Sequence, residues 1–153
     1  GERNYIPVGF VDSSYVINNN AHALYNPEIF IFSFVSSKMH MSWVNVVSGR
    51  MRSDFNYSSS FCYNPFPIPK IDIQTKKNLE KIAFDIIDIR EKFPDLTIAQ
   101  LYNNKTMPNL LKSAHKNIDN VIDKCYRNDE FKSDDDRVKF LFEMYENNKR
   151  NLI

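Results

Sequence analysis

The stretch "MPNLLKSAHKNIDNVIDKCY", Met107 to Tyr126, repeats its apolar residues at the spacing of an α-helix. Intervals of three and four residues bring such side chains onto one stripe, which can face a core. Pro108 suits the first turn of this helix, where a backbone N–H has no helical partner. We therefore predict one amphipathic helix here, with the apolar stripe Leu111, Ala114, Ile118, Val121, Ile122 and Cys125.

Further helices are predicted on either side of this one. Before it, a helix opens at Asp72 or Thr75 and is closed by Pro94. Between the two, "DLTIAQLY" predicts a short helix. After it, Ser133 is a candidate N-cap, with Asp134–Asp136 at the positive end of the helix dipole. The apolar stripes of the outer helices are Leu79, Ile82, Ala83, Ile86 and Ile87, and Val138, Leu141, Phe142 and Tyr145.

The first 70 residues have a different character. They contain five Lys or Arg and four Asp or Glu, whereas residues 71–153 contain fifteen of each kind. The seam is "YNPFPIPKID", whose three prolines favour an extended connector. Short strands are predicted in "YIPVGFV" and "SSYVIN", and a buried strand in "LYNPEIFIFSFVSS". A helix capped by Ser36 or Ser37 follows and ends near Gly49.

These patterns predict an α+β fold in two parts. Residues 1–70 would form a small mixed α/β portion, and residues 71–153 a helical domain. The net charge of +1 argues against a broadly basic nucleic-acid-binding surface. No apolar run reaches the roughly 18 residues of a membrane span, and no signal peptide is visible. Two distant cysteines suit a reducing compartment, so we expect a cytoplasmic protein without a membrane partner.

Catalytic patterns are missing from the sequence. No glycine-rich loop follows a strand, which argues against a nucleotide or S-adenosylmethionine pocket. "YNPFP" differs from the Asn-Pro-Pro-aromatic motif of amino-methyltransferases and is better explained as a turn in the connector. His22, His40 and His115 lack ligand spacing, and no nucleophile stands beside a histidine. We therefore expect no catalytic residue, metal or cofactor in this chain.

The stretch "SGRMRSDFNYSSSF" has an alternating pattern. Arg50, Arg52, Asp54 and Asn56 occupy every second position and would share one face of a strand. Arg can pair with guanine, Asp with cytosine and Asn with adenine, so Arg52 and Asp54 together could read one G·C pair. The same two residues could equally form a surface ion pair of little energetic consequence. The pattern alone leaves both interpretations open.

The order of several segments resembles the MmeI-like type IIG restriction–modification enzymes. "SSKMHMSWVNVVSGRMRSDFNYSSSFCYNPFPIP" is similar to the end of their target recognition domain, with Pro65 in place of a usual second Asn. "FPDLTIAQLY", "TMPNLLKSAHKNIDNVIDKCY" and "FKSDDDRVKFLFEMY" resemble their C-terminal helical domain. The recognition-domain matches are Ser36, Ser37, His40, Trp43, Gly49, Arg50, Ser53, Tyr57, Ser58, Tyr63, Asn64, Phe66, Pro67 and Pro69.

The resemblance implies sequence-specific binding of duplex DNA by a C-terminal fragment of a longer enzyme. The parent would carry an upstream adenine N6-methyltransferase domain that uses S-adenosylmethionine, together with a nuclease domain, and the fragment itself would be non-catalytic. If the roles of residues in that family hold at the matching positions here, Arg52, Asp54 and Asn56 read bases. Asn20, near an upstream turn, would be a further base-reading residue. Candidate phosphate contacts are Arg50 and Lys38. The alternative is a protein-interaction module that docks a partner through its helical tail.

Overall fold

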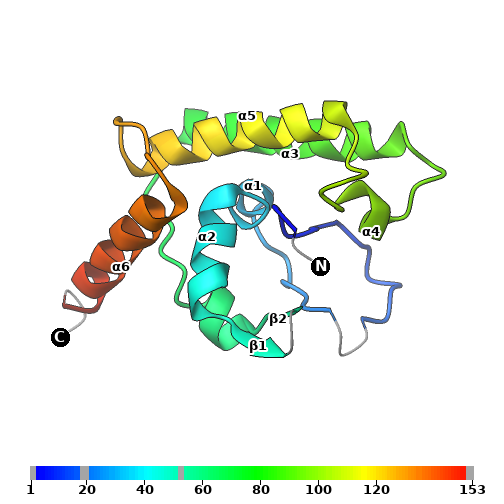
Figure 1. Cartoon of the computed structure of the whole chain (residues 1–153). Helices are drawn as coiled ribbons and strands as arrows, with labels where there is room; N and C mark the ends of the chain where they lie inside the picture. The colour runs from blue at the N-terminus through cyan, green and yellow to red at the C-terminus, as the bar shows by residue number, and fades with distance from the viewer. Residues whose placement is uncertain (1–2, 18–20, 52–53, 151–153) are drawn as a thin grey trace.

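The chain folds as two crossed layers of helices with a small hairpin at one end (Figure 1). The computed structural model describes residues 3–17, 21–51 and 54–150, and for residues 50, 51, 54 and 55 it describes the backbone. Within these ranges, none of the helices combines the length and hydropathy needed to cross a membrane. The elements are α1 (Phe30–Val35), α2 (Lys38–Val47), β1 (Gly49–Met51), β2 (Asp54–Asn56), the π-helical turn η1 (Ser59–Tyr63), α3 (Ile73–Glu91), α4 (Ile98–Leu101), α5 (Asn109–Tyr126) and α6 (Asp134–Arg150).

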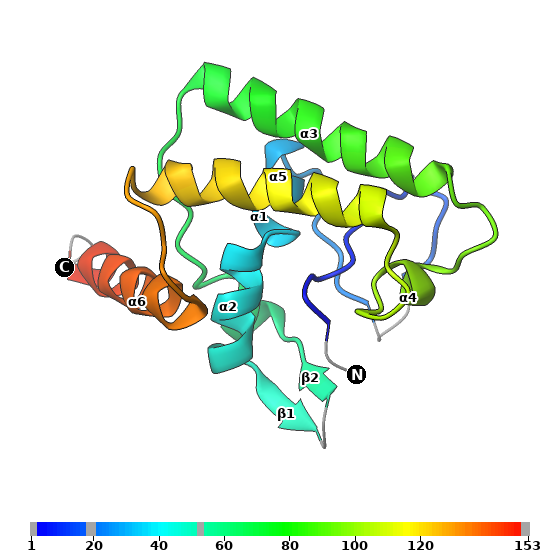
Figure 2. The same cartoon turned by 45° about the horizontal axis from the view of Figure 1, so that its top comes forward.

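Helices α3 and α5 lie side by side and antiparallel as one layer (Figure 2). Asp72 is confirmed as a cap, because its carboxylate accepts from the Thr75 N–H at 2.7 Å. Pro108, expected in the first turn, lies one residue before α5 begins. Thr97 and Gln100 cap α4 reciprocally. Fully buried side chains from the predicted stripes fill the space beneath the layer, namely Leu79, Ala83, Ile86, Leu111, Ile118 and Ile122.

Helix α1 replaces the buried strand that was predicted in "LYNPEIFIFSFVSS". The chain bends at Asn26, whose φ of 48° is one that Asn tolerates, and becomes helical at Phe30. Helix α1 packs on both α3 and α5, and the Ser33 hydroxyl donates to the Leu79 carbonyl at 2.7 Å. Apolar residues on every side of a short buried helix resemble those of a buried strand, so periodicity could not separate the two.

The strands predicted near the N-terminus are also absent from the described residues. Some groups in this segment instead contact residues of the helices. Tyr5 stacks on His115 with ring centroids 4.2 Å apart, and Phe10 lies 5.3 Å from Phe32. The Arg90 guanidinium donates to the Val8 carbonyl at 2.6 Å. In a strand, that carbonyl would have accepted from the backbone of a neighbouring strand. The predicted α+β class is therefore wrong, because the described structure is helical apart from one hairpin with three residues in each strand.

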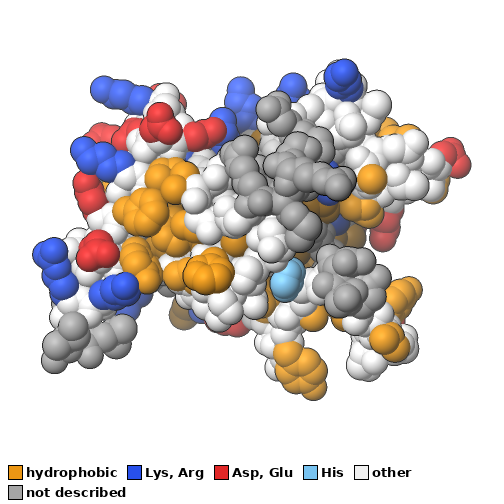
Figure 3. Space-filling model, turned by 60° about the horizontal axis from the view of Figure 1, so that its bottom comes forward, with side chains coloured by type: hydrophobic (Ala, Val, Ile, Leu, Met, Phe, Trp, Pro, Cys, Tyr) orange, Lys and Arg blue, Asp and Glu red, His pale blue; other side chains and the backbone are white. Residues whose placement is uncertain are grey.

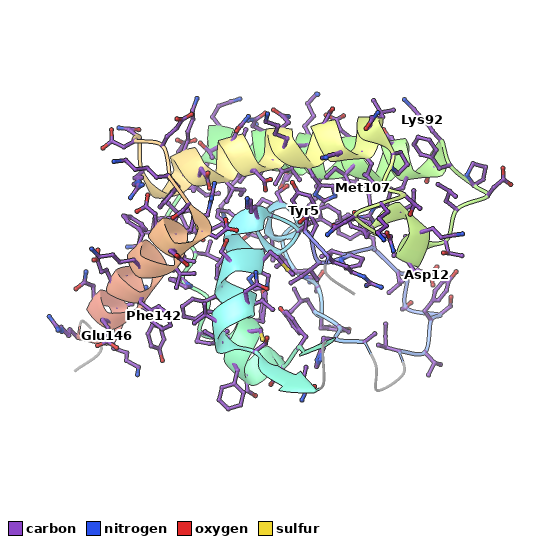
Figure 4. The ribbon with its side chains drawn as sticks, in the orientation of Figure 1. Tyr5, Asp12, Lys92, Met107, Phe142 and Glu146 are labelled. Atoms are coloured by element: carbon purple, nitrogen blue, oxygen red, sulfur yellow. The ribbon has the colours of Figure 1, made fainter. Side chains whose placement is uncertain are left out.

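Helix α6 crosses below the layer and packs along α2. The Ser133 hydroxyl accepts from the Asp136 N–H at 3.1 Å, which confirms its predicted capping role. Arg137, 9% exposed, donates to both carboxylate oxygens of Asp123 and so ties α6 to α5. Figure 4 shows Phe142 pointing from α6 into the space beside α2, where its ring lies 5.0 Å from that of Trp43.

Candidate nucleic-acid interface

The stretch "GRMRSDFN" forms an antiparallel hairpin and not the single strand that its alternation predicted. Gly49 pairs with Asn56, Arg50 with Phe55, and Met51 with Asp54. Gly49 was expected to cap the preceding helix, but Ser48 is the C-cap and Gly49 is already the first residue of β1. The hairpin projects away from the α3–α5 layer, at the lower end of α2 (Figure 2).

The register separates the candidate positions. Residues opposite each other in an antiparallel pair share a face, and successive residues alternate. Positions 54 and 56 therefore fall on one face of the hairpin and position 50 on the other. This register differs from the single strand that was expected, in which positions 50, 54 and 56 would share one face. Asn56 is exposed, while Arg52 and Asn20 lie outside the described residues.

Helix α2 supports the hairpin from a fixed base. Its N-cap is Ser37, whose hydroxyl accepts from the His40 N–H at 3.3 Å. Met39 and Trp43 are at most 2% exposed, whereas Val46 is 55% exposed. Because α2 is embedded over most of its length, the strand that leaves its C-terminal end starts from a rigid point.

Tyr57 fastens the other end of the hairpin to α2. It follows Asn56 directly, and its hydroxyl lies 3.0 Å from Nε2 of His40. Burial lowers the pKa of His40 to about 3, so this imidazole is neutral near neutral pH. Its ring also lies edge-on to Phe66 at 4.4 Å. These non-local contacts make His40 a packed, hydrogen-bonded histidine, and its spacing in the sequence did not indicate Tyr57 as its partner.

Lys38 lies at the opposite end of α2 from the hairpin. Ten helical residues rise about 15 Å, so Lys38 is well separated from Gly49. Its ammonium lies 3.4 Å from a carboxylate oxygen of Asp134 at the start of α6. Its backbone N–H donates to Asp119 at 2.7 Å. Charged side chains gather near α6 on the hairpin side of the molecule, as Figure 3 shows.

The described part of the site offers hydrogen-bonding groups to a ligand. Among the residues that the structure describes, no three His, Cys, Asp or Glu side chains meet as a metal site would require. Cys62 in η1 is fully buried, and burial raises the pKa of its thiol, which disfavours the nucleophilic thiolate. A hairpin that projects from a rigid helix can instead present polar side chains, such as the exposed Asn56, to a partner's surface.

Comparison with known proteins defines the class of this chain. Residues 1–70 match the family described as "MmeI, target recognition domain", and residues 71–153 match "MmeI, C-terminal domain". The chain thus consists of a target-recognition part followed by a C-terminal part of this family. It belongs to the MmeI family.

Two relatives extend this assignment. The chain is 38% identical over 144 residues to DNA methyltransferase A of Bacillus subtilis (strain 168), a match that covers 94% of this chain and 16% of that protein. It also superimposes, with a TM-score of 0.92 and 36% identity, on the type IIL restriction–modification enzyme MmeI in complex with DNA. That match covers 97% of this chain and 20% of the other. The chain therefore spans a small part of each relative.

Proposed function

We propose that the β1–β2 hairpin reads base edges of duplex DNA. The observation that carries the proposal is a hairpin that projects from the end of a buried helix, with Gly49 and Asn56 exposed, in a chain of a target-recognition family. B-DNA's major groove is wide enough to admit a two-stranded ribbon. Arg52 and Asp54 are the proposed readers of one G·C pair, and Asn56 of a neighbouring base. The proposal also keeps Asn20 as a further base contact.

The two proposed phosphate contacts, Arg50 and Lys38, should contribute unequally to DNA affinity. Position 50 lies on the hairpin face opposite to positions 54 and 56, which suits a residue that positions the duplex without reading it. Lys38 is nearly half exposed but already pairs with Asp134 at 3.4 Å. We therefore expect Arg50 to contribute more to DNA affinity than Lys38.

We propose that residues 1–70 end the recognition domain and that residues 71–153 are a helical domain that holds it in place. The bonds Ser33–Leu79 and Lys38–Asp119 cross between the two parts and support this role. The parent enzyme would carry its methyltransferase domain upstream, use S-adenosylmethionine to methylate adenine N6, and work in the bacterial cytoplasm, with a nuclease domain on the same chain. The name of the Bacillus relative supports the methyltransferase part.

Residues present here do not fit the methyl donor itself. The chain has only three glycines, at positions 1, 9 and 49, and neither Gly9 nor Gly49 opens a helix after a strand. A loop that cradles such a cofactor needs closely spaced glycines in that place. We therefore assign the cofactor to the upstream part of the parent and no catalytic step to this chain.

Selection from a random-sequence duplex library tests the proposal with the full-length enzyme that contains this segment. Fragments retained at moderate salt should share one site, and Asn56→Ala should relax one position of it by about 1–3 kcal/mol. Asn128→Ala, at an exposed position between α5 and α6, is the matched control and should select the unaltered site. Retained fragments without a common site would reject the proposal.

A further inference from the structure

Tyr57 is bound from two directions immediately after the hairpin. Its hydroxyl meets Nε2 of His40, and its backbone carbonyl lies 2.8 Å from Nε2 of His22. A carbonyl can only accept, so Nε2 of His22 carries a proton and donates it. The rings of His22 and Tyr57 also lie 5.3 Å apart. One residue thus joins the hairpin exit to α2 and to the N-terminal segment.

The two histidines occupy different environments. His40 belongs to the buried face of α2 and is 0% exposed. His22 is exposed and lies in a segment without a helix or strand. His40 therefore provides the fixed base, and His22 adds a second restraint from the surface.

The position of Asn56 depends on these restraints. It pairs with Gly49 in the hairpin on one side and is joined covalently to Tyr57 on the other. A three-residue pair of strands has little stability of its own. Holding the Tyr57 carbonyl and ring therefore limits how far the exit strand can shift, and base discrimination requires side chains held within about half an ångström.

We propose that His22 and Tyr57 are positioning residues for base discrimination, which hold the hairpin's exit strand in its reading position. The proposal rests on the proposed function of the hairpin. Neither residue needs to touch DNA. Their loss should lower the preference for the correct base and leave the sequence-independent attraction to phosphates unchanged.

The test compares four variants of the full-length enzyme. His22→Leu removes the donor, His22→Gln restores a side-chain N–H, and Tyr57→Phe removes the hydroxyl and keeps the ring. Tyr15→Phe, on an exposed ring of the same N-terminal segment, is the matched control. Two affinities are measured for each, one for the selected site and one for the same duplex with the base pair read by Asn56 exchanged. Affinity for an unrelated duplex at low salt monitors folding and phosphate binding.

His22→Leu and Tyr57→Phe should lower the ratio of the two affinities about two- to tenfold, which is the range expected for one hydrogen bond. His22→Gln should recover most of that loss, and Tyr15→Phe should match the unaltered enzyme. Unchanged ratios in His22→Leu and Tyr57→Phe, beside a lowered ratio in Asn56→Ala, would overturn the positioning role alone. An unchanged ratio in Asn56→Ala would overturn base reading by the hairpin first. A fall in unrelated-duplex affinity equal to the fall for the site would show general misfolding and also overturn the proposal.

Discussion

The carboxylate of Asp119, on α5, accepts a hydrogen bond at 2.7 Å from the backbone N–H of Lys38, the first residue of α2. Its other oxygen accepts from the Tyr5 hydroxyl, also at 2.7 Å. Figure 4 shows Tyr5 beneath α5, close to α1. A helix N-terminus favours a negative charge, so a residue of the C-terminal part caps the helix that carries the hairpin.

Replacing Asp119 should therefore loosen the recognition part through α2. Asp119→Ala leaves the Lys38 N–H and the Tyr5 hydroxyl without a partner in a buried place, and we expect a loss of about 2–3 kcal/mol in the free energy of unfolding. Asp119→Asn keeps an acceptor and should lose about 1 kcal/mol. Urea unfolding measures both, with the exposed Asn120→Ala as control. Equal losses for the Ala and Asn variants would show that the cap does not act through these bonds.

Acid should destabilise the fold through His115. Burial, with Arg90 nearby, lowers the pKa of His115 from 6.5 to about 3. Between these pH values the unfolded chain binds the proton and the folded chain does not. Stability is thus complete above pH 6.5 and falls as pH decreases toward 3, by up to roughly 4 kcal/mol.

Unfolding free energies measured between pH 7 and 4 test this dependence. His115→Gln removes the titrating group and retains a partner for the Tyr102 hydroxyl, which lies 2.9 Å from Nε2 of His115. Its stability should fall less steeply with acid than that of the unaltered chain, whereas the exposed neighbour Asn117→Gln should keep the original slope. Identical slopes in all three proteins would contradict the buried, neutral state of His115.

The contact between α6 and α2 can be followed through Trp43, the only tryptophan of the chain. Phe142 is 37% exposed, so Phe142→Ala should cost only about 1–2 kcal/mol of stability, whereas fully buried Leu141→Ala should cost about 2–5 kcal/mol. The Phe142 variant should also shift Trp43 fluorescence to longer wavelength as water reaches the indole. Phe84→Ala, on α3, should leave the emission unchanged, and an unshifted emission in Phe142→Ala would argue against this packing.

Arg50 should affect DNA affinity without affecting sequence preference. Removing one phosphate contact lowers the salt dependence of binding by about one unit in a plot of log K against log salt concentration. Arg50→Ala in the full-length enzyme should show this change for every duplex tested. Lys105→Ala, at an exposed position in the loop after α4, is the control. If Arg50→Ala instead altered the accepted base, Arg50 would be a reader.

Local signals predicted the helical part well. Asp72 and Ser133 cap the helices they were expected to cap, because capping depends on residues only three apart. The run Phe30–Val35 was misassigned because burial on all sides removes the periodicity that distinguishes helix from strand. The alternating pattern from Arg50 to Asn56 correctly predicted strand structure. It could not show that the chain reverses between Met51 and Asp54 and so forms two strands.

The features of the site that the sequence did not predict depend on contacts between residues far apart in the chain. Tyr57 meets His22 across 35 positions of the sequence, and Lys38 meets Asp119 across 81. No spacing rule connects residues so far apart, so neither bond could be inferred before the fold was known. The candidate readers came from resemblance to a family, and the structure adds the register in which positions 54 and 56 lie.

Exchanging Arg52 and Asp54 tests base reading by the hairpin most directly. The double variant Arg52→Glu, Asp54→Arg is made in the full-length enzyme, and the methylated sites are mapped by sequencing. If these residues read one G·C pair, the accepted base should change at one position of the site and the other positions should stay as they were. Methylation of the original site, unaltered at every position, would contradict base reading by Arg52 and Asp54.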